Sequence, residues 1–377
     1  MRKLLLLVGA IVFVDTMFFV ALTPLLPEYA EEFGLSKAGA GVLSAAYPAG
    51  ALLGGVPSGL AAARIGARPT AVAGLVVIAV TTFVFATADS IWLLDASRFV
   101  QGLASAFAWT AGLTWLVGGT PPERRGQMIG SAMAAAIVGA LFGPVLGGAA
   151  SIVGEPIAFG AVGVAALALA LWALGTEAPA RAEPQPLRLL FGAMRDRQIV
   201  LGFWLVALPA LFFGTLAVLA PLRLEELGFT AAAIGALWLG TAALEAIANP
   251  VVGRFSDRVG RVPPMRISVF AGAIVALLLP WPDKAYLLAA LVVLGGVSFG
   301  SFWTPAMALL SDEAEHRGLE HAYVFAIVNL AWAPGQTLGS SGSGALAHVT
   351  SDTVPYLLLA ASCLLTFAVL WRSRSSS

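Results

Sequence analysis

Charged side chains are scarce in this sequence: they make up 11% of its 377 residues, whereas hydrophobic residues make up 59%. A water-soluble domain carries roughly a quarter charged residues. The apolar excess is too large for a water-soluble core, so we infer that lipid surrounds much of the chain. The 21 basic and 21 acidic residues cancel, which removes the case for nucleic acid as a partner.

Cysteine is nearly absent as well. The single cysteine, Cys363, lies in an apolar run and can form no disulfide within the chain. The sequence contains no CxxC, HExxH or phosphate-binding GxxxxGK pattern, so common signatures of metal sites and nucleotide-binding enzymes are missing. We therefore expect no enzyme activity, no cofactor and no metal site.

What the sequence does contain is an internal repeat. The stretch Gly59-x-x-x-Ala63-Arg64-x-Gly66 returns 194 residues later as Gly253-x-x-x-Asp257-Arg258-x-Gly260, followed by Arg261. The same offset relates Pro27 to Pro221, Gly41 to Gly235, Gly102 to Gly296 and Trp109 to Trp303. A fixed offset over so long a stretch indicates duplication, so we predict two copies of one hydrophobic unit.

Twelve apolar runs are long enough to cross a bilayer as helices, since about 20 residues are needed. They cover approximately residues 4–27, 38–62, 69–88, 91–118, 127–153, 156–175, 198–221, 230–252, 264–280, 285–309, 319–348 and 353–371. Ser36 and Thr230 are predicted N-caps of the second and eighth runs. Pro334 and nearby glycines are expected to break the eleventh.

These runs predict an all-α integral membrane fold of 12 transmembrane helices in two pseudo-symmetric six-helix bundles. We place the N-terminal bundle at 1–175, a polar linker at 176–197 and the C-terminal bundle at 198–377. Within the linker, residues 187–194 are expected to form a short helix on the membrane surface.

Basic residues set the predicted orientation. With the N-terminus in the cytoplasm, seventeen of the 21 basic residues fall in cytoplasmic segments, three lie on the opposite side and Arg98 lies within a span. The positive-inside rule therefore predicts a plasma (inner) membrane protein with both termini in the cytoplasm. The first run resembles a cleavable signal peptide, but it continues past Asp15 to Pro27 of the repeat, which favours its retention.

Three ionisable residues inside predicted spans are the strongest functional candidates: Asp15, Arg98 and Glu245. A charge there costs roughly 2.5–3.5 kcal/mol even on insertion scales, so each needs a partner or a water-filled cavity. Asp15 is interpreted as a carboxylate that exchanges a proton for substrate, or else as a structural carboxylate bonded to a neighbouring helix. Arg98 would act on Asp15 or on substrate anions, or pair locally with Asp95. Glu245, whose repeat counterpart is Ala51, would be a second such acid or a satisfied buried carboxyl.

Other polar and aromatic residues could line a substrate cavity beside these charges. They are Tyr47, Gln101, Trp109, Asn249, Trp303, Asn329 and Gln336. Asn329 and Gln336 are seven residues apart and so share a helix face. Each candidate has a structural alternative, which is hydrogen bonding between helices for the amides and packing for the aromatic rings.

A glycine-rich motif in the fifth run predicts close helix packing. It consists of Gly139, Gly143, Pro144, Gly147 and Gly148. Glycines let another helix approach to backbone contact, and a proline removes one helical hydrogen bond and bends the helix. A bent helix with a smooth face is suited to rocking, although generic packing would explain the same pattern.

The duplicated halves, the central linker and the Gly/Arg turn after the second span of each half resemble the major facilitator superfamily. Its drug:proton antiporter branch is suggested by Gly139–Gly148, by Arg98-Phe-Val-Gln101-Gly102, and by Asp15-Thr16 with Pro24 and Pro27. The resemblance implies a monomeric, proton-coupled antiporter for multidrug efflux that exports small lipophilic or cationic molecules by alternating access. A sugar or metabolite exporter, or an uncoupled facilitator of the same fold, is the alternative.

The resemblance also implies that the Gly/Arg turns form a gate. The residues concerned are Gly59, Arg64 and Gly66 in the first half, and Gly253, Asp257, Arg258, Gly260 and Arg261 in the second. The aspartate of the family pattern is present as Asp257, whereas Ala63 stands at the first-half position. Asp257 would face the start of the fifth span near Arg124 and Arg125, and the gate would be asymmetric.

Overall fold

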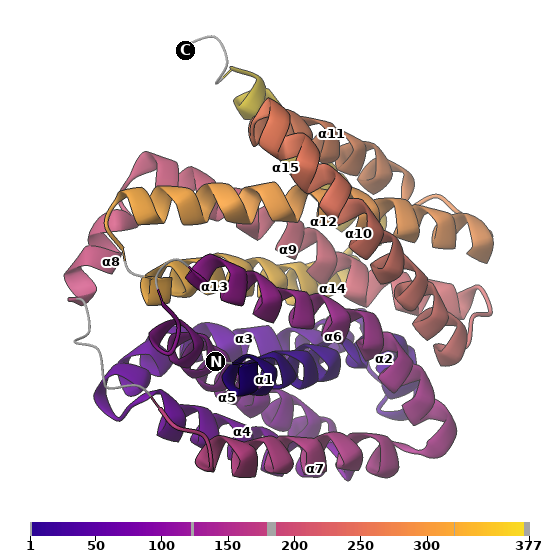
Figure 1. Ribbon diagram of the computed structural model, residues 1–377. Helices are drawn as coiled ribbons and strands as arrows, with labels where there is room; N and C mark the ends of the chain where they lie inside the picture. Colours follow the sequence, from indigo (N-terminus) through magenta and orange to yellow (C-terminus); the bar gives the residue numbers. More distant parts are fainter. Residues whose placement is uncertain (1, 122–123, 179–185, 320, 373–377) are drawn as a thin grey trace.

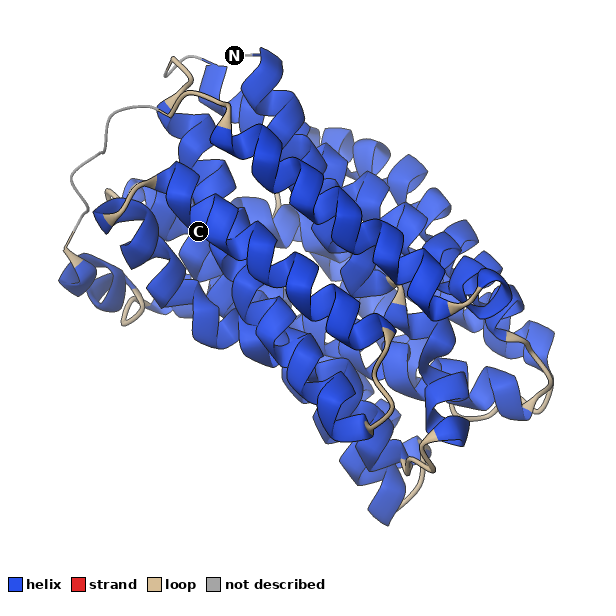
Figure 2. Cartoon of the chain, turned by 90° about the horizontal axis from the view of Figure 1, so that it is seen from below, coloured by secondary structure: helices blue, strands red, loops and turns tan. Residues whose placement is uncertain are grey.

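Helices form nearly all of the structure, a computed structural model that describes residues 2–121, 124–178, 186–319 and 321–372. Figure 2 shows helices and loops but no strand in this part of the chain. A backbone surrounded by lipid must satisfy its own N–H and C=O groups, and a helix does so within one segment.

The helices follow one another in the predicted order. The first half contains α1 (Arg2–Val20), α2 (Leu22–Glu32), α3 (Lys37–Arg64), α4 (Ala67–Ala86), α5 (Ile91–Gly118), α6 (Arg125–Val153) and α7 (Glu155–Leu174). The connecting α8 (Leu187–Ala193) confirms the short helix predicted there. The second half contains α9 (Arg197–Glu226), α10 (Ala231–Val259), α11 (Val262–Leu278), α12 (Ala285–His316), α13 (His321–Thr337), the π-helical turn η2 (Leu338–Gly342), α14 (Ser343–Val349) and α15 (Thr353–Arg372).

Each of the twelve predicted spans coincides with a helix or a broken helix. Within the described part, nine segments are long and apolar enough to cross a membrane by length and composition alone. The remaining three predicted spans do not meet this criterion of length and composition. Polar residues dilute α5, α11 has only 17 residues, and the eleventh span is divided into α13, η2 and α14.

The first and eleventh spans are each interrupted, the first beside a proline and the eleventh at a glycine-rich turn. Pro24 has no N–H to donate to the carbonyl oxygen of Val20, and α1 ends at Val20. The eleventh span is broken at the predicted glycines, in the turn η2, but not at Pro334, because α13 continues through Pro334 to Thr337. Both breaks fall inside the bundle, so backbone carbonyl groups become available there to side chains of other helices.

Side-chain caps determine where three helices begin. The hydroxyl groups of Ser36 and Thr230 each accept a hydrogen bond from the backbone N–H three residues ahead, at 3.3 Å, which confirms both predicted N-caps. Asp196 caps α9 by accepting from the backbone N–H of Gln198 at 2.8 Å. This hydrogen bond, with help from Arg317 at 2.8 Å, lowers the pKa of the Asp196 carboxyl.

The sequence repeat is also visible in backbone conformation. Gly34 and Gly228 have φ values of 60° and 93°, and Gly66 and Gly260 have φ values of 103° and 89°. These pairs are related by the repeat, and only glycine adopts positive φ without strain. The two halves therefore make the same turns at the same places.

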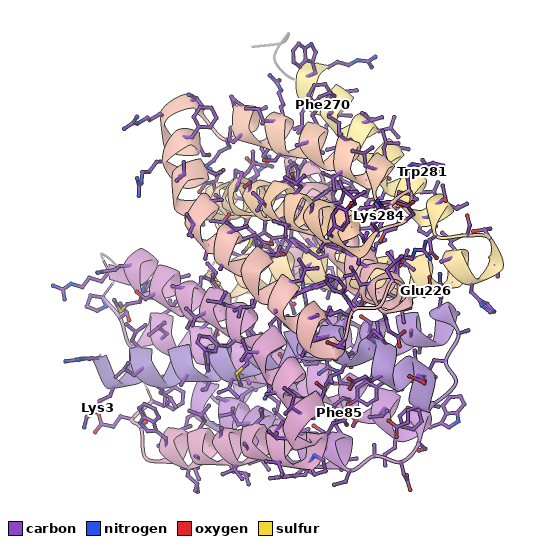
Figure 3. The ribbon with its side chains drawn as sticks, turned by 90° about the vertical axis from the view of Figure 1, so that its right-hand side faces the viewer. Lys3, Phe85, Glu226, Phe270, Trp281 and Lys284 are labelled. Atoms are coloured by element: carbon purple, nitrogen blue, oxygen red, sulfur yellow. The ribbon has the colours of Figure 1, made fainter. Side chains whose placement is uncertain are left out.

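The two halves lie side by side, with α1–α7 in the lower part of Figure 1 and most of α9–α15 in the upper part. They meet where α3 packs against α13 and α14, and where α6 packs against α10. We retain 1–175, 176–197 and 198–377 as the proposed domain boundaries. We call the end that carries the N-terminus and α8 the linker end, and the opposite end the far end; Figure 3 places Lys3 at the former and Glu226 toward the latter.

Glycines let α3 and α5 approach to backbone contact. A Cβ atom placed on Gly102 would overlap the carbonyl oxygen of Tyr47, and one placed on Gly50 would overlap that of Phe99. Both obstacles are backbone atoms, which cannot turn aside as a flexible side chain can. This contact holds Tyr47 beside α5, where the site described below is built.

We predict that Gly102→Ala lowers the free energy of unfolding by about 1–3 kcal/mol, because the added methyl group must push α3 away from α5. The matched control is Gly160→Ala in α7, where no atom lies within 4 Å of the added position. That change should leave stability unaltered or raise it by up to about 1 kcal/mol. Thermal unfolding of the purified protein in detergent measures both, and equal effects would contradict the prediction.

Candidate functional site

Asp15, on α1, is held by three hydrogen-bond donors from two other helices. The Tyr47 hydroxyl donates to Oδ1 at 2.8 Å, and the Ser105 hydroxyl and Trp109 Nε1 each donate to Oδ2 at 2.7 Å. Asp15 is only 7% exposed. We call Asp15, Tyr47, Ser105 and Trp109 the aspartate cage. It gives the buried carboxylate the partners that the membrane interior requires.

Ser105 is the cage residue that sequence reasoning missed. It lies four residues after Gln101 and four before Trp109, so all three share one face of α5. That spacing was an available signal, because both neighbours were already candidates. Gln101 itself is fully buried and turns toward Arg98, whose Nη1 lies 3.4 Å from its Oε1.

Arg98 lies next to the cage and is 1% exposed. Its guanidinium group donates to the carbonyl oxygens of Phe19 at 3.0 Å and Phe18 at 3.4 Å, just before the break in the first span. It also lies over the ring of Tyr47, 4.9 Å from the ring centroid. Tyr47 therefore joins the two charges, since its hydroxyl group binds Asp15 while its ring faces Arg98.

The alternative of a local pair between Asp95 and Arg98 is not what the structure has. The hydrogen bonds of Arg98 go to α1 and to Gln101, and no ion pair joins the two residues within the described chain. Asp95 Oδ1 is buried without a hydrogen-bond partner there. The guanidinium group of Arg98 donates instead to backbone carbonyl oxygens of α1, across the contact between α5 and α1.

Glu245, on α10, is in the opposite situation from Asp15. Its carboxylate lies against two glycines of α12, with Oε1 2.8 Å from the position a Cβ would take on Gly296 and Oε2 2.7 Å from that on Gly300. No hydrogen bond or ion pair joins Glu245 to another described residue. Asn249, one turn later, has a buried Oδ1 that also lacks a partner in the described chain. The two candidate acids thus belong to different halves and are not brought together in one cluster.

An aromatic bridge joins the halves beside the cage. Phe19 packs on the ring of Tyr47 with centroids 4.9 Å apart, and Trp332 of α13 meets Phe19 edge-on at 5.6 Å. Sequence reasoning missed Phe19 and Trp332, since nothing in an apolar run distinguishes these rings from packing residues.

The remaining predicted lining residues lie on different surfaces. Asn329 reaches Gly55 at the contact between α13 and α3. Gln336 is buried where α13 meets Gly214 of α9. Trp303 is partly buried and packs against the core cluster that contains Phe212, Phe299 and Phe302.

The glycine motif of α6 has two faces. Gly139, Gly143 and Gly147 lie against the backbone or small side chains of the first span, from Phe13 to Pro24. Pro144 and Gly148 instead face α10 of the other half: a Cβ on Gly235 would lie 2.8 Å from the Pro144 carbonyl oxygen, and a Cβ on Gly148 3.6 Å from Cα of Ala232. One side of α6 is therefore packing within the first half, and the other is a smooth contact between the halves.

The predicted gate residues lie at the linker end. Arg64, Arg124 and Arg258 are exposed, and Arg261 pairs with Asp312 at 3.3 Å. Gly59 and Gly253 have open space around them, and Gly66 and Gly260 make the turns already described. The side chain of Asp257 lies outside the described residues, so its contact with the region of Arg124 and Arg125 stays a prediction.

A contact between the halves at the far end was not foreseen. Lys37 Nζ lies 2.7 Å from both carboxylate oxygens of Asp352 and 3.9 Å from Glu226 Oε1. Beside it, a Cβ on Gly41 would lie 2.7 Å from the Ser340 carbonyl oxygen and 3.3 Å from Cα of Gly344. We call Lys37, Asp352, Gly41 and Gly344 the far-end latch. Lys37 and Asp352 are 315 residues apart in sequence, so no local pattern links them.

Residues 296–300 have the GxSxG spacing of a hydrolase nucleophile turn. They lie within α12, however, and the Ser298 hydroxyl donates to the carbonyl oxygen of Leu294 at 2.7 Å. A nucleophile turn needs a strand followed by a helix, so this stretch is helix packing rather than a catalytic motif.

Comparison with known proteins gives a consistent picture. The Major Facilitator Superfamily profile matches residues 8–318 and again 210–377. The MFS-type transporter ppzB of Metarhizium rileyi is 39% identical over 104 residues, which are 28% of this chain and only 22% of that relative. The chloramphenicol resistance protein of Streptomyces lividans is 28% identical over 373 residues, covering 92% of this chain and 91% of the relative.

Solved structures share the fold. A bacterial homologue of the human lysosomal transporter Spinster, in an inward-facing and occupied conformation, superposes with a TM-score of 0.81 at 16% identity. The match covers 99% of this chain and 96% of that one.

The aspartate cage predicts that its hydrogen-bond donors contribute unequally to stability. Tyr47→Phe leaves Asp15 Oδ1 with no donor while keeping the ring beneath Arg98, whereas Ser105→Ala leaves Oδ2 with Trp109. We expect Tyr47→Phe to cost about 1–3 kcal/mol of unfolding free energy and Ser105→Ala clearly less. Thermal unfolding in detergent tests the order, and repeating both changes in an Asp15→Asn background should shrink the difference. The reverse order would refute the assignment of donors.

Proposed function

This chain belongs to the Major Facilitator Superfamily, and from that premise we propose that it is a secondary active transporter that exports small lipophilic or cationic molecules in exchange for protons. The chain is a multi-pass membrane protein with a transporter fold. The observation that carries the proposal is the aspartate cage, because a carboxylate inside a membrane helix with three donors is sensitive to the gain of a proton.

Protonation of Asp15 changes what the cage can do. The ionised carboxylate accepts from all three donors, but the protonated one carries an O–H that needs an acceptor. The Tyr47 or Ser105 hydroxyl can supply it only by turning its own proton elsewhere. Proton binding on α1 therefore alters the contacts of α1 with α3 and α5, and through Tyr47 it alters the surroundings of Arg98.

Arg98 extends this coupling to the break in the first span. It donates to the carbonyl oxygens of Phe18 and Phe19, next to the turn at Ala21 between α1 and α2. A helix break is a point where a segment can change direction with little loss of internal hydrogen bonding. We infer that the protonation state of Asp15 biases the angle of this span.

The far-end latch supports an assignment of conformational state. With the latch formed, the halves are in backbone contact at the far end. The positive-inside rule assigns the linker end and both termini to the cytoplasm. We propose that the structure is the cytoplasm-facing state of a monomer in the plasma (inner) membrane, and that α3 against α14 and α6 against α10 are the surfaces on which the halves rock.

The relatives bear on the kind of cargo. Similarity over nearly the whole chain to a protein that confers chloramphenicol resistance supports a drug-like small molecule rather than a sugar. The aromatic bridge of Phe19 and Trp332 supports an apolar surface close to the proton site.

The proton role has a direct test in inside-out membrane vesicles with an acidic interior, using ethidium as the transported probe. We expect Asp15→Asn to lower the initial rate of gradient-driven uptake at least tenfold, because no titratable carboxyl remains in the cage. Asp283→Asn, at an exposed far-end position, is the matched control and should transport normally. Undiminished uphill accumulation by Asp15→Asn would exclude the role assigned to this residue, provided that the purified variant retains its melting temperature.

The latch makes a separate prediction about access. In a chain whose native Cys363 is replaced by serine, a reporter cysteine at Ser44 lies beneath the latch, where the Ser44 hydroxyl now meets Ser340 at 3.3 Å. Lys37→Ala should raise its labelling rate by a membrane-impermeant maleimide from the far end up to about fivefold, since a partly exposed ion pair contributes up to about 1 kcal/mol.

Lys284→Ala is the control for that experiment, because Lys284 is a far-end lysine whose ammonium lies over Tyr286 rather than in the latch. Its labelling rate should equal that of the parent. Equal labelling of the Lys37→Ala chain and the parent would show that the ion pair does not hold the far end closed.

A further inference from the structure

The second half carries two hydrogen-bond acceptors where the first half carries none. The repeat relates Ala51 to Glu245 and Gly55 to Asn249, which lie one turn apart on α3 and α10. In the first half Gly55 lies against Asn329 and Leu330 of α13, and Ala51 is buried. In the second half a carboxylate and an amide stand on the corresponding face of α10. The same scaffold therefore carries a pair of polar groups where the first half carries small residues.

The partner helix leaves room for these groups. Glu245 lies on bare backbone at Gly296 and Gly300, because a Cβ at either position would be within 2.8 Å of its carboxylate oxygens. Trp303 follows Gly300 by three residues and so shares this face of α12. The carboxylate therefore lies at the contact between α10 and α12, and the Asn249 amide is one turn away on α10.

Neither acceptor has a donor among the described residues. Glu245 makes no hydrogen bond or ion pair with the part of the protein that the structure covers, and the buried Oδ1 of Asn249 is likewise unpartnered there. Asp15 differs, because three donors already occupy its oxygens. An acceptor without a donor is unfavourable inside a helix bundle, so a hydrogen-bond donor from outside the described chain would gain by binding at Glu245 and Asn249.

We propose that Glu245 and Asn249 form a subsite for the ammonium group of a transported molecule, a primary or secondary amine in its protonated form. An ammonium group supplies both the positive charge that the carboxylate needs and more than one N–H for two acceptors one turn apart. An indole such as that of Trp303, one turn after Gly300 on α12, would attract the same charge. The proposal rests on the proposed function in that the ligand is the transported molecule, and it places substrate charge in the second half, apart from the proton site at Asp15.

A matched pair of probes tests this subsite at equilibrium: dansylcadaverine, which has a free primary amine, and its N-acetyl derivative, which is neutral but otherwise alike. Binding to the purified full chain in detergent at pH 7 is followed by dansyl fluorescence. We expect the amine to bind at least tenfold more tightly than the amide, as a charge-assisted hydrogen bond provides. Glu245→Gln should remove this preference, Asn249→Leu should reduce it, and Asp283→Asn should keep it.

A second variant keeps the test decisive if Glu245→Gln does not fold. Gly300→Ala places a methyl group 2.7 Å from Glu245 Oε2 and must displace the carboxylate, so it should also weaken the preference for the amine. Equal binding of both probes to the parent, or an unchanged preference in Glu245→Gln and in Gly300→Ala, would overturn the subsite. No pH gradient is present in this assay. Loss of proton-driven transport with an intact amine preference would therefore count against the proposed function alone.

Discussion

The rest of the structure depends on how the chain accommodates charge inside a lipid-surrounded bundle. An ionised carboxylate there needs donors, and Asp15 obtains three of them only because α3 and α5 come close enough to present Tyr47, Ser105 and Trp109 together. That approach in turn requires Gly50 and Gly102, where any side chain would meet backbone. The glycines therefore create the geometry in which a carboxylate can be tolerated inside the bundle.

The two halves solve the same problem differently. In the first half the acid is enclosed and satisfied, and a buried arginine ties the enclosure to a broken helix. In the second half the acid lies against glycine backbone without a donor from the described chain. Duplication supplied equal scaffolds, and the polar residues then diverged at positions 51 and 245. An acid with three donors already has its partners, whereas one without donors is available to any donor that enters, so the asymmetry suits the proposed exchange of two ligands.

The sequence predicted the fold nearly completely and the site only in part. Span lengths, the Ser36 and Thr230 caps and the break of the eleventh span at its glycines follow from local chemistry, which a single stretch of sequence contains. Asp15 was recognisable because charge in an apolar run is unfavourable wherever it lies. The pairing of Lys37 with Asp352 and the meeting of Phe19 with Trp332 depend on how distant helices pack. The local Asp95–Arg98 pair was a reasonable helical spacing, but carbonyl groups at the helix break took the arginine instead.

The positions of these contacts suggest why opening one end would be linked to the first span. The far-end latch involves α3 at Lys37 and Gly41, and the same helix carries Tyr47 two turns further along. A tilt of α3 that separates Gly41 from Gly344 must also move Tyr47 relative to Asp15, because a packed helix moves as a rigid body over so short a distance. The aspartate cage and the far-end latch therefore both depend on the position of helix α3. A proton that loosens the cage and a movement that opens the latch would both act on the eleven residues of α3 from Lys37 to Tyr47, which connect the proposed proton site to the far-end contact.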